Sequence, residues 1–202
     1  MRTLLFIFAA FITFSAFTYK AGLSKKERKA AIAYLKETKK ALAKNIKGLS
    51  EAQLTYRTAA GRWSVEECIK HIAATEEGLW KMVEGGLNAA PNPEKRSEIK
   101  MNDEAVKKTI TDRSFKAQAP EPFRPENIPY KTAAEAFAAF ETKRDKLIGY
   151  VKNTSADMRN HVLTLPLGSL DAYQMVLFIA AHSRRHTLQI EEVMADAGFP
   201  KQ

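Results

Sequence analysis

The sequence is poor in cysteine: Cys68 is the only one in 202 residues, which excludes an internal disulfide. The fold must therefore be held together by its apolar core or by a metal ion. A Cys–His pair formed by Cys68 and His71 could bind zinc, but a small buried residue is the simpler interpretation of Cys68. Internal repeats and low-complexity tracts are also absent, and the apolar content of 45% is that of a folded domain.

An apolar run long enough for a comfortable membrane span is missing as well. Residues 4–17 are apolar except for Thr13 and Ser15, and Arg2 precedes them. This pattern is typical of a signal peptide. We expect residues 1–19 to be a signal peptide and the protein to be exported, periplasmic or extracellular, with no stable membrane contact after cleavage. Because no small-x-small pair precedes Lys20, an N-terminal anchor formed by residues 4–17 is the alternative.

Acidic residues are in the minority, and the formal charge is +9. Such a balance raises the question of nucleic acid or an anionic membrane as a partner. The lysines and arginines are dispersed, however, and acidic residues lie among them. A solvated helix face explains this pattern better than a groove that binds phosphates. We therefore expect no nucleic-acid partner.

Convincing strand runs are lacking, whereas four segments carry apolar residues at helical spacing, at about residues 24–46, 63–86, 132–151 and 169–197. Capping boxes precede the first three segments, and Gly198 and Pro200 follow the last. The pattern predicts an all-α, antiparallel four-helix bundle over residues 24–198. The first three boxes pair Ser24 with Glu27, Ser64 with Glu67, and Thr132 with Glu135.

A long crossover connection, residues 87–131, separates the second and third helices and holds six of the eight prolines. A short helix over residues 102–110 is expected within it. A connection of this length is uncommon inside a compact domain and often covers a site. A plain link between two helices is the other interpretation, and the sequence leaves both open.

The fourth helix places His182 and His186 in the middle of its apolar stripe. Residues four apart on a helix lie about 40° apart around its axis and one turn along it, so the two imidazoles can converge on one ion. Buried imidazoles need polar partners, and a metal ion satisfies both. Ser183 follows the first histidine, so the glutamate of the H-E-x-x-H peptidase motif is absent.

His71, on the flank of the second helix's stripe, is the candidate for a third ligand. In an antiparallel bundle its depth can match that of the histidine pair on the fourth helix. His161 lies in the loop before the fourth helix and follows no pattern, so we expect it at the surface.

Two segments together resemble a known family. Residues 61–72, GRWSVEECIKHI, look like the Trp-Ser-x-x-Glu-x-x-x-His opening of the second helix in the DinB-like superfamily. Residues 181–190, AHSRRHTLQI, resemble its His-x-x-x-His-x-x-Gln-Ile closing helix. The resemblance covers about residues 24–198. It implies an up-down-down-up bundle in which His71, His182 and His186 bind a divalent metal ion. Nickel and zinc are the first candidates for this ion.

The resemblance also suggests a function. Some members of that superfamily transfer small thiols, and others isomerise or hydrolyse small substrates. We therefore expect a metal-dependent hydrolase or transferase with a small-molecule substrate, which could form a homodimer. The export signal departs from this pattern and puts thiol transfer in doubt, because cytosolic thiol cofactors are scarce outside the cell. A non-catalytic metal- or ligand-binding domain of the cell envelope and a bundle with a degenerate site are the alternatives.

No catalytic residue can be assigned from the sequence. An ion held by three neutral imidazoles keeps its charge and an open position, where it could acidify water or activate a thiolate. We expect an acceptor to hold the other nitrogen of each ring. Glu67 is a candidate acceptor for His71, although its role in the capping box is the stronger one. Groups that could transfer protons or anchor a substrate are Glu76, Tyr173, Arg185 and Gln189.

Overall fold

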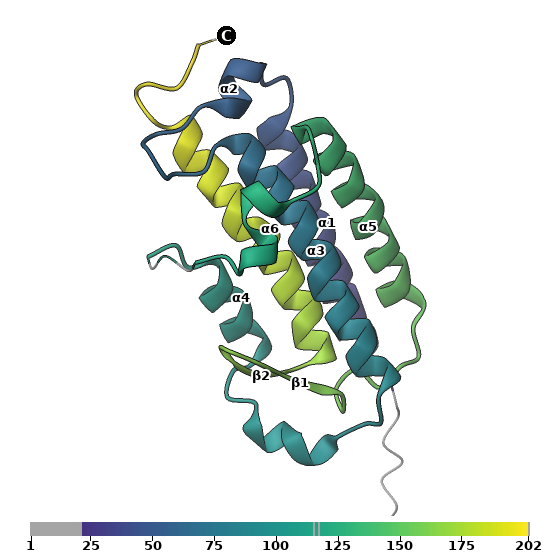
Figure 1. Cartoon of the computed structure of the whole chain (residues 1–202). Coiled ribbons are helices and arrows are strands. Elements are labelled where there is room, and N and C mark those ends of the chain that lie inside the picture. The colour runs from purple at the N-terminus through teal and green to yellow at the C-terminus, as the bar shows by residue number, and fades with distance from the viewer. Residues whose placement is uncertain (1–21, 115, 117, 202) are drawn as a thin grey trace, which may run out of the picture.

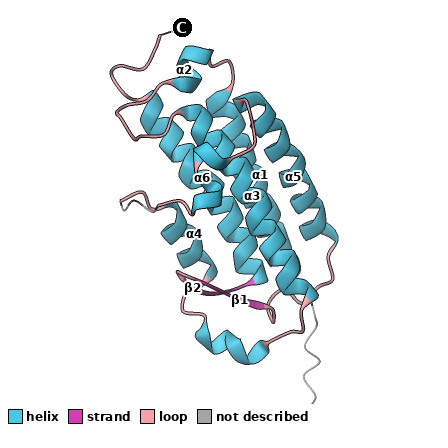
Figure 2. Cartoon of the chain, viewed as in Figure 1, coloured by secondary structure: helices cyan, strands magenta, loops and turns pink. Residues whose placement is uncertain are grey.

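Four long helices lie side by side in the computed structural model, which describes residues 22–201 except 115 and 117 (Figure 1). They are α1 (Lys25–Ile46), α3 (Val65–Asn88), α5 (Ala133–Asn153) and α6 (Ala172–Met194). Helices dominate the structure, as Figure 2 shows, and the predicted all-α four-helix bundle is confirmed. The expected signal peptide, residues 1–19, lies outside the described residues. No helix in the described part of the chain is long and apolar enough to cross a membrane.

The helices begin where the sequence predicts. The side chains of Ser24, Ser64 and Thr132 each accept a hydrogen bond from the backbone three residues on, and the first two form full capping boxes. The last helix begins two or three residues later than expected. Asp171 caps it and forms a reciprocal pair with Gln174, an Asp-x-x-Gln variant of the capping box.

The chain runs up through α1, down through α3 and α5, and up through α6, so α3 and α5 are parallel (Figure 1). Both α1 and α3 pack against α5 and α6. Arg28, at the start of α1, bonds to the backbone of Thr154, just after the end of α5. Asn45, near the end of α1, bonds to Glu191, near the end of α6. The helix pattern alone predicts antiparallel neighbours, whereas only α1–α5 and α3–α6 are antiparallel. The order implied by the resemblance is the observed one.

Short elements fill the connections. The five-residue helix α2 (Glu51–Thr55) lies between α1 and α3. The long crossover from α3 to α5 contains the short helix α4 (Asp103–Thr111), which Asn102 caps as predicted. It also contains three 3-10 turns, η1 (Pro93–Glu98), η2 (Glu121–Phe123) and η3 (Pro125–Asn127). About half of the connection therefore has local secondary structure, and α4 packs on α6.

The expectation that the chain has no strands is wrong at one place. Strands β1 (Val162–Leu165) and β2 (Gly168–Asp171) form an antiparallel hairpin, in which Val162 is opposite Asp171. Gly168 has φ +119°, which suits glycine and allows the tight turn after Pro166 and Leu167. Four-residue strands are too short for an alternating pattern to stand out in the sequence. The hairpin closes the end of the bundle at which α6 starts.

A buried ion pair crosses the middle of the bundle. Arg144 lies on the buried face of α5 and is itself fully buried. Its guanidinium donates to both carboxylate oxygens of Glu76, at 2.5 and 2.7 Å, and to the Ser183 hydroxyl at 2.9 Å. It also donates to the Leu35 carbonyl and the Thr38 hydroxyl of α1. One side chain thus ties all four helices together.

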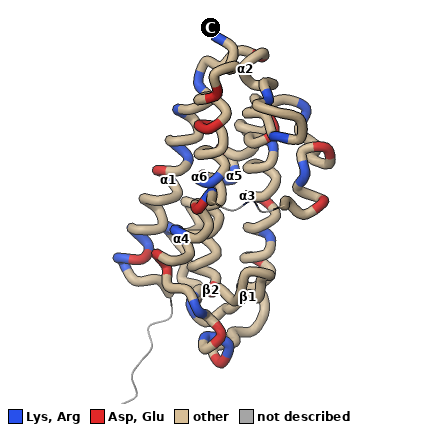
Figure 3. Tube along the Cα trace, turned by 90° about the vertical axis from the view of Figure 1, so that its left-hand side faces the viewer, with Lys and Arg blue, Asp and Glu red and all other residues tan. Residues whose placement is uncertain are grey.

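Basic and acidic residues are interspersed along the chain, as the blue and red segments of Figure 3 show. Lys39 of α1, for example, contacts Glu141 and Asp145 of α5. Exposed pairs of this kind contribute little to stability. The lack of a nucleic-acid partner stays a prediction.

Candidate metal centre

The structure brings His71, His182 and His186 together. One candidate ligand atom from each ring lies within 4.8 Å of those of the other two. His71 lies about two turns into α3, and His182 and His186 lie near the middle of α6, which runs antiparallel to α3. The three histidines therefore lie at similar levels along the axis of the bundle. His71 and His186 are buried, and His182 is partly exposed. His182 is therefore the most accessible residue of the cluster.

An oxygen atom lies beside Nδ1 of every ring. Nδ1 of His71 is 2.7 Å from the Phe123 carbonyl, which can only accept a hydrogen bond. Nδ1 of His182 is 3.3 Å from the Thr75 hydroxyl, which itself donates to the carbonyl of His71. Nδ1 of His186 is 3.0 Å from Oε1 of Gln189. These contacts place the ring protons on Nδ1 and leave the Nε2 lone pairs for a ligand.

The Nε2 atoms of His71 and His182 are 3.3 Å apart. With both protons on Nδ1, these two atoms present lone pairs to each other, which is unfavourable unless a cation accepts them. Tetrahedral zinc, with Zn–N distances of about 2.0–2.1 Å, sets two nitrogens about 3.3 Å apart. The spacing of the two nitrogens thus fits ligands of one ion. The cluster fits a divalent-metal site.

Burial keeps the rings neutral. It lowers the pKa of His71 to about 4, against the opposing effect of the hydrogen bond to the Phe123 carbonyl. Burial, together with the neighbouring imidazoles, also holds the pKa of His182 and of His186 well below 6.5. Neutral imidazole is the form that binds metal ions. The rings are therefore ready to coordinate a cation near neutral pH.

Aromatic side chains form the walls of the cluster. The Trp63 ring lies 4.8 Å from that of His71 and 5.7 Å from that of His186, between centroids. Phe178 stacks parallel to His182 from one turn earlier on α6. A cavity of about 650 Å³ adjoins Trp63 and is also lined by Pro125 and Glu126 of the long connection. A larger cavity, of about 830 Å³, lies at the other end of α6, away from the histidines.

Neither glutamate that the sequence offered as a functional group reaches the rings through a hydrogen bond. Glu67 caps α3 and pairs with Arg57, and the acceptor that it was expected to provide for His71 is instead the Phe123 carbonyl. Glu76 is committed to Arg144 in the core. A backbone carbonyl 52 residues away along the chain cannot be foreseen from side-chain patterns.

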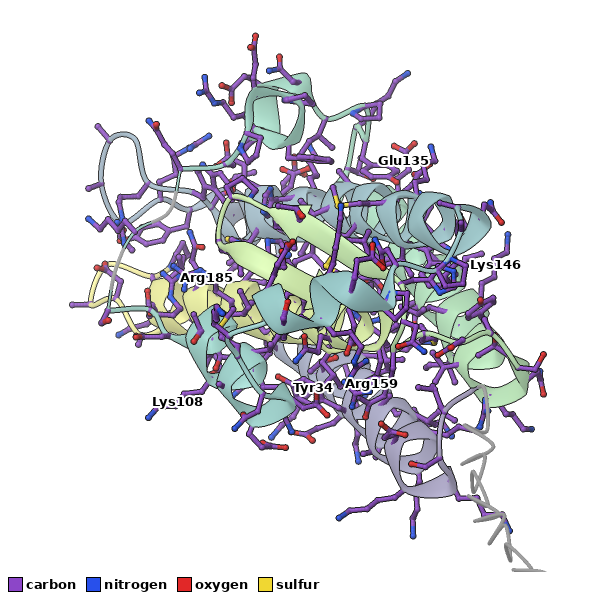
Figure 4. The ribbon with its side chains drawn as sticks, turned by 90° about the horizontal axis from the view of Figure 1, so that it is seen from below. Tyr34, Lys108, Glu135, Lys146, Arg159 and Arg185 are labelled. Atoms are coloured by element: carbon purple, nitrogen blue, oxygen red, sulfur yellow. The ribbon has the colours of Figure 1, made fainter. Side chains whose placement is uncertain are left out.

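The other candidates for proton transfer or substrate anchoring lie in different parts of the bundle. The Tyr173 hydroxyl donates to the backbone of Glu27 near the far end of α6. Arg185 lies between α6 and α4 (Figure 4) and donates to the backbone of Asp112. Gln189 lies beside a histidine of the cluster, with its Oε1 next to Nδ1 of His186. Sequence reasoning missed Thr75, although its position four residues after His71 is a usable signal.

The structure confirms the expected burial of Cys68 but not the expected exposure of His161. Cys68 is fully buried, as predicted, and burial raises the pKa of its thiol, which makes it an unreactive core residue. His161 is buried and not at the surface as expected. Its ring lies between the carbonyl oxygens of Asp157 and Ala89, at 2.7 and 3.3 Å. The end of α3 covers it, which a loop's lack of pattern does not reveal.

Known proteins match this chain in sequence and in fold. The model of the DinB superfamily matches residues 34–190. The uncharacterized protein YuaE of Bacillus subtilis (strain 168) is 25% identical over 149 residues, which cover 73% of this chain and 87% of YuaE. Among solved structures, YfiT from Bacillus subtilis has a TM-score of 0.60 at 15% identity, over 89% of this chain and 92% of that one. YfiT is described as a probable metal-dependent hydrolase with an unusual four-helix bundle topology.

The chain belongs to the DinB superfamily, because the family model matches most of its length. The likeness to YfiT shows the shared fold.

Proposed function

We propose that this DinB-superfamily protein binds one divalent metal ion through His71, His182 and His186 and uses it to hydrolyse a small molecule or to transfer a group to it. The observation that carries the proposal is the set of three adjacent rings whose Nδ1 atoms lie beside oxygen acceptors, which leaves the Nε2 atoms to bind a cation. The description of YfiT as a probable metal-dependent hydrolase supports the choice of reaction class.

The ligand set determines what chemistry is available. A divalent ion bound by three neutral imidazoles would supply a Lewis acid with open coordination positions. Around it, His182 is the one partly exposed residue of the three, and Trp63, whose ring lies beside His71 and His186, lines the adjoining cavity. Imidazole suits several transition metals, so we propose nickel and zinc as the first ions to test.

The specific alternative is a domain of the cell envelope that binds a metal or a ligand without catalysis. One observation favours it: among the described residues, no carboxylate joins the histidine cluster. Glu67 and Glu76 are occupied by Arg57 and Arg144, so neither of these two carboxylates is available for proton transfer at the rings. Metal binding is common to both functions, and turnover separates them.

Metal analysis of the purified protein tests the proposal. The wild type should retain or take up one equivalent of nickel or zinc, and each of His71→Ala, His182→Ala and His186→Ala should lose it. His161→Ala is the matched control, because His161 is the remaining histidine and bonds only to backbone carbonyls. Circular dichroism of every variant checks that it is folded. Stoichiometric metal in all three site variants would refute the triad.

A substrate screen then separates the two functions. Activated esters, amides and thiol acceptors are offered to the metal-loaded protein and to the same protein after chelation. Turnover that disappears with the metal and returns with it supports the enzyme. Metal binding without turnover of any probe favours the envelope-binding domain, and turnover that survives chelation contradicts metal-dependent catalysis.

Export is a separate proposal. We propose that residues 1–19 are removed as a signal peptide, so that the mature N-terminus lies near Lys20. N-terminal sequencing of the protein from the cell envelope and the medium tests this, and an intact Met1 in the membrane fraction would favour the anchor instead.

A further inference from the structure

One of the three acceptors beside the histidines is able to turn into a donor. The Phe123 carbonyl cannot donate at all, and the Thr75 hydroxyl has already given its proton to the His71 carbonyl at 2.6 Å. Gln189 differs, because its amide carries an acceptor oxygen and a donor NH2 group on the same planar unit. If this amide turned by 180°, its NH2 group would face Nδ1 of His186.

The turned amide would move the proton of His186. An NH2 donor beside Nδ1 requires a lone pair there, so the neutral ring would carry its proton on Nε2. Nε2 is the nitrogen left for the metal, and a protonated Nε2 cannot coordinate. The orientation of the Gln189 amide therefore decides whether His186 is able to bind an ion.

Arg113 fixes that orientation. It follows α4 in the long connection, and its Nη1 donates to Oε1 of Gln189 at 3.2 Å. Its Nε and Nη2 both donate to the carboxylate of Glu192 at 2.7 Å, which holds the guanidinium in place. A guanidinium has no acceptor, so the atom of Gln189 that faces it must be the oxygen. The same oxygen lies 3.0 Å from Nδ1 of His186.

We infer that Arg113 is a positioning residue of the metal centre: it keeps the Gln189 oxygen turned toward His186, and so keeps the His186 proton on Nδ1. The inference rests on the proposed function for its consequence in metal binding. The effect of Arg113 on the position of the His186 proton does not require a bound metal.

The inference gives the long connection a role. Phe123, which holds the proton of His71, and Arg113, which sets that of His186, both belong to the crossover between α3 and α5. Asp112, next to Arg113, is held to α6 by Arg185. Two of the three rings thus depend on the connection for their correct tautomer, and a plain link between helices would contribute neither contact.

Nitrogen-15 NMR of the metal-free protein at pH 7.5 tests the inference. Long-range proton–nitrogen spectra distinguish Nδ1–H from Nε2–H imidazole. The wild type should show His186 as the Nδ1–H form, and Arg113→Met should show a substantial fraction of Nε2–H. Arg113→Lys keeps a group that can only donate, and should keep the wild-type tautomer. Arg184→Met is the control, because it removes another arginine that pairs with a glutamate on α6.

A second substitution tests the mechanism directly. In Arg113→Met/Gln189→Glu, the carboxylate next to His186 has no donor, so it needs no arginine to orient it. The double variant should return His186 to the Nδ1–H form. Zinc affinity should follow the tautomer, with a loss of about tenfold or more in Arg113→Met, a loss typical of outer-shell partners of metal ligands, and recovery in the double variant.

The outcomes separate the inference from the proposed function. An unchanged Nδ1–H tautomer in Arg113→Met overturns the inference, even if zinc affinity falls, because Arg113 would then act only through the local structure. Failure of the double variant to restore the tautomer also overturns it. If the wild type binds no zinc or nickel but the tautomer shifts as predicted, the proposed function fails and the positioning role stands.

Discussion

Two polar clusters lie inside the same bundle, and they differ in how their hydrogen bonds are satisfied. Around Arg144, five donor contacts reach the oxygens of Glu76, Ser183, Thr38 and Leu35, so donors and acceptors match. Around the histidines, the donors are satisfied at Nδ1 while acceptor nitrogens face each other at Nε2. The first cluster is complete in the protein alone. The second would be completed by the metal ion that we propose.

Ser183 shows how close the two clusters are. It lies between the two histidines of α6 in sequence, yet its hydroxyl accepts from Arg144 and donates to the backbone of Ala180. The position that holds the catalytic glutamate in an H-E-x-x-H helix therefore belongs here to the structural cluster. One helix contributes its polar residues to two different tasks, according to the side on which each lies.

The largest expected effect comes from breaking the complete cluster. Arg144→Met leaves the Glu76 carboxylate buried without its partner, which should cost about 3–5 kcal/mol of unfolding free energy. Urea titration measures this. The double variant Glu76→Leu/Arg144→Met removes both charges and should recover most of the loss. A double variant as unstable as the single one would show that the stability does not depend on matching the two charges.

The incomplete cluster should respond to acid instead. In the unfolded chain His71 takes up a proton near its ordinary pKa of about 6.5, and in the folded metal-free protein only near pH 4. The unfolded state therefore binds more protons between these values. Free energy of unfolding should fall as the pH drops from about 6.5 to 4, by about 3 kcal/mol from His71 alone.

Urea titrations at pH 7.5, 6 and 5 measure this fall. His71→Gln has no titrating ring and should show a shallower pH dependence between pH 6.5 and 4. Curves of equal slope for the two proteins would contradict the account of a ring kept neutral by burial.

The sequence predicts the frame of both clusters but not their contacts. The capping serines and the apolar stripes locate the helices, because these signals are local. Arg144 shares the buried face of α5 with apolar residues, but its partner Glu76 lies 68 residues away and has no local signal. His71 was found by its stripe and motif, but the Phe123 carbonyl that holds it carries no side-chain signal.

One glycine does carry a signal of this contact. A side chain at Gly78, in the middle of α3, would lie 2.6 Å from the Phe123 ring, so this glycine allows η2 to pack against the helix. Glycine inside a helix is otherwise unfavourable and often marks a close approach. Its position about two turns beyond His71 could have indicated that something covers α3 there.

The smallest expected effect compares two glycines of α3. Gly85→Ala adds a methyl group that meets nothing within 4 Å, and should stabilise the protein by about 0.5–1 kcal/mol through helix propensity. Gly78→Ala should lose this gain, because the Phe123 ring must move. Thermal unfolding of the two variants gives the difference. Only Gly78→Ala should also weaken zinc binding, since η2 carries the acceptor of His71; equal effects of both variants on zinc would contradict that link.

The central claim is that three imidazoles of this chain hold one divalent ion. X-ray absorption at the zinc edge of the zinc-loaded protein tests it most directly, because imidazole rings have a recognisable outer-shell pattern. The account predicts three imidazoles per zinc, at about 2.0–2.1 Å, in the wild type and in His161→Ala. One or two imidazoles per zinc, or a signal that His182→Ala leaves unchanged, would contradict it.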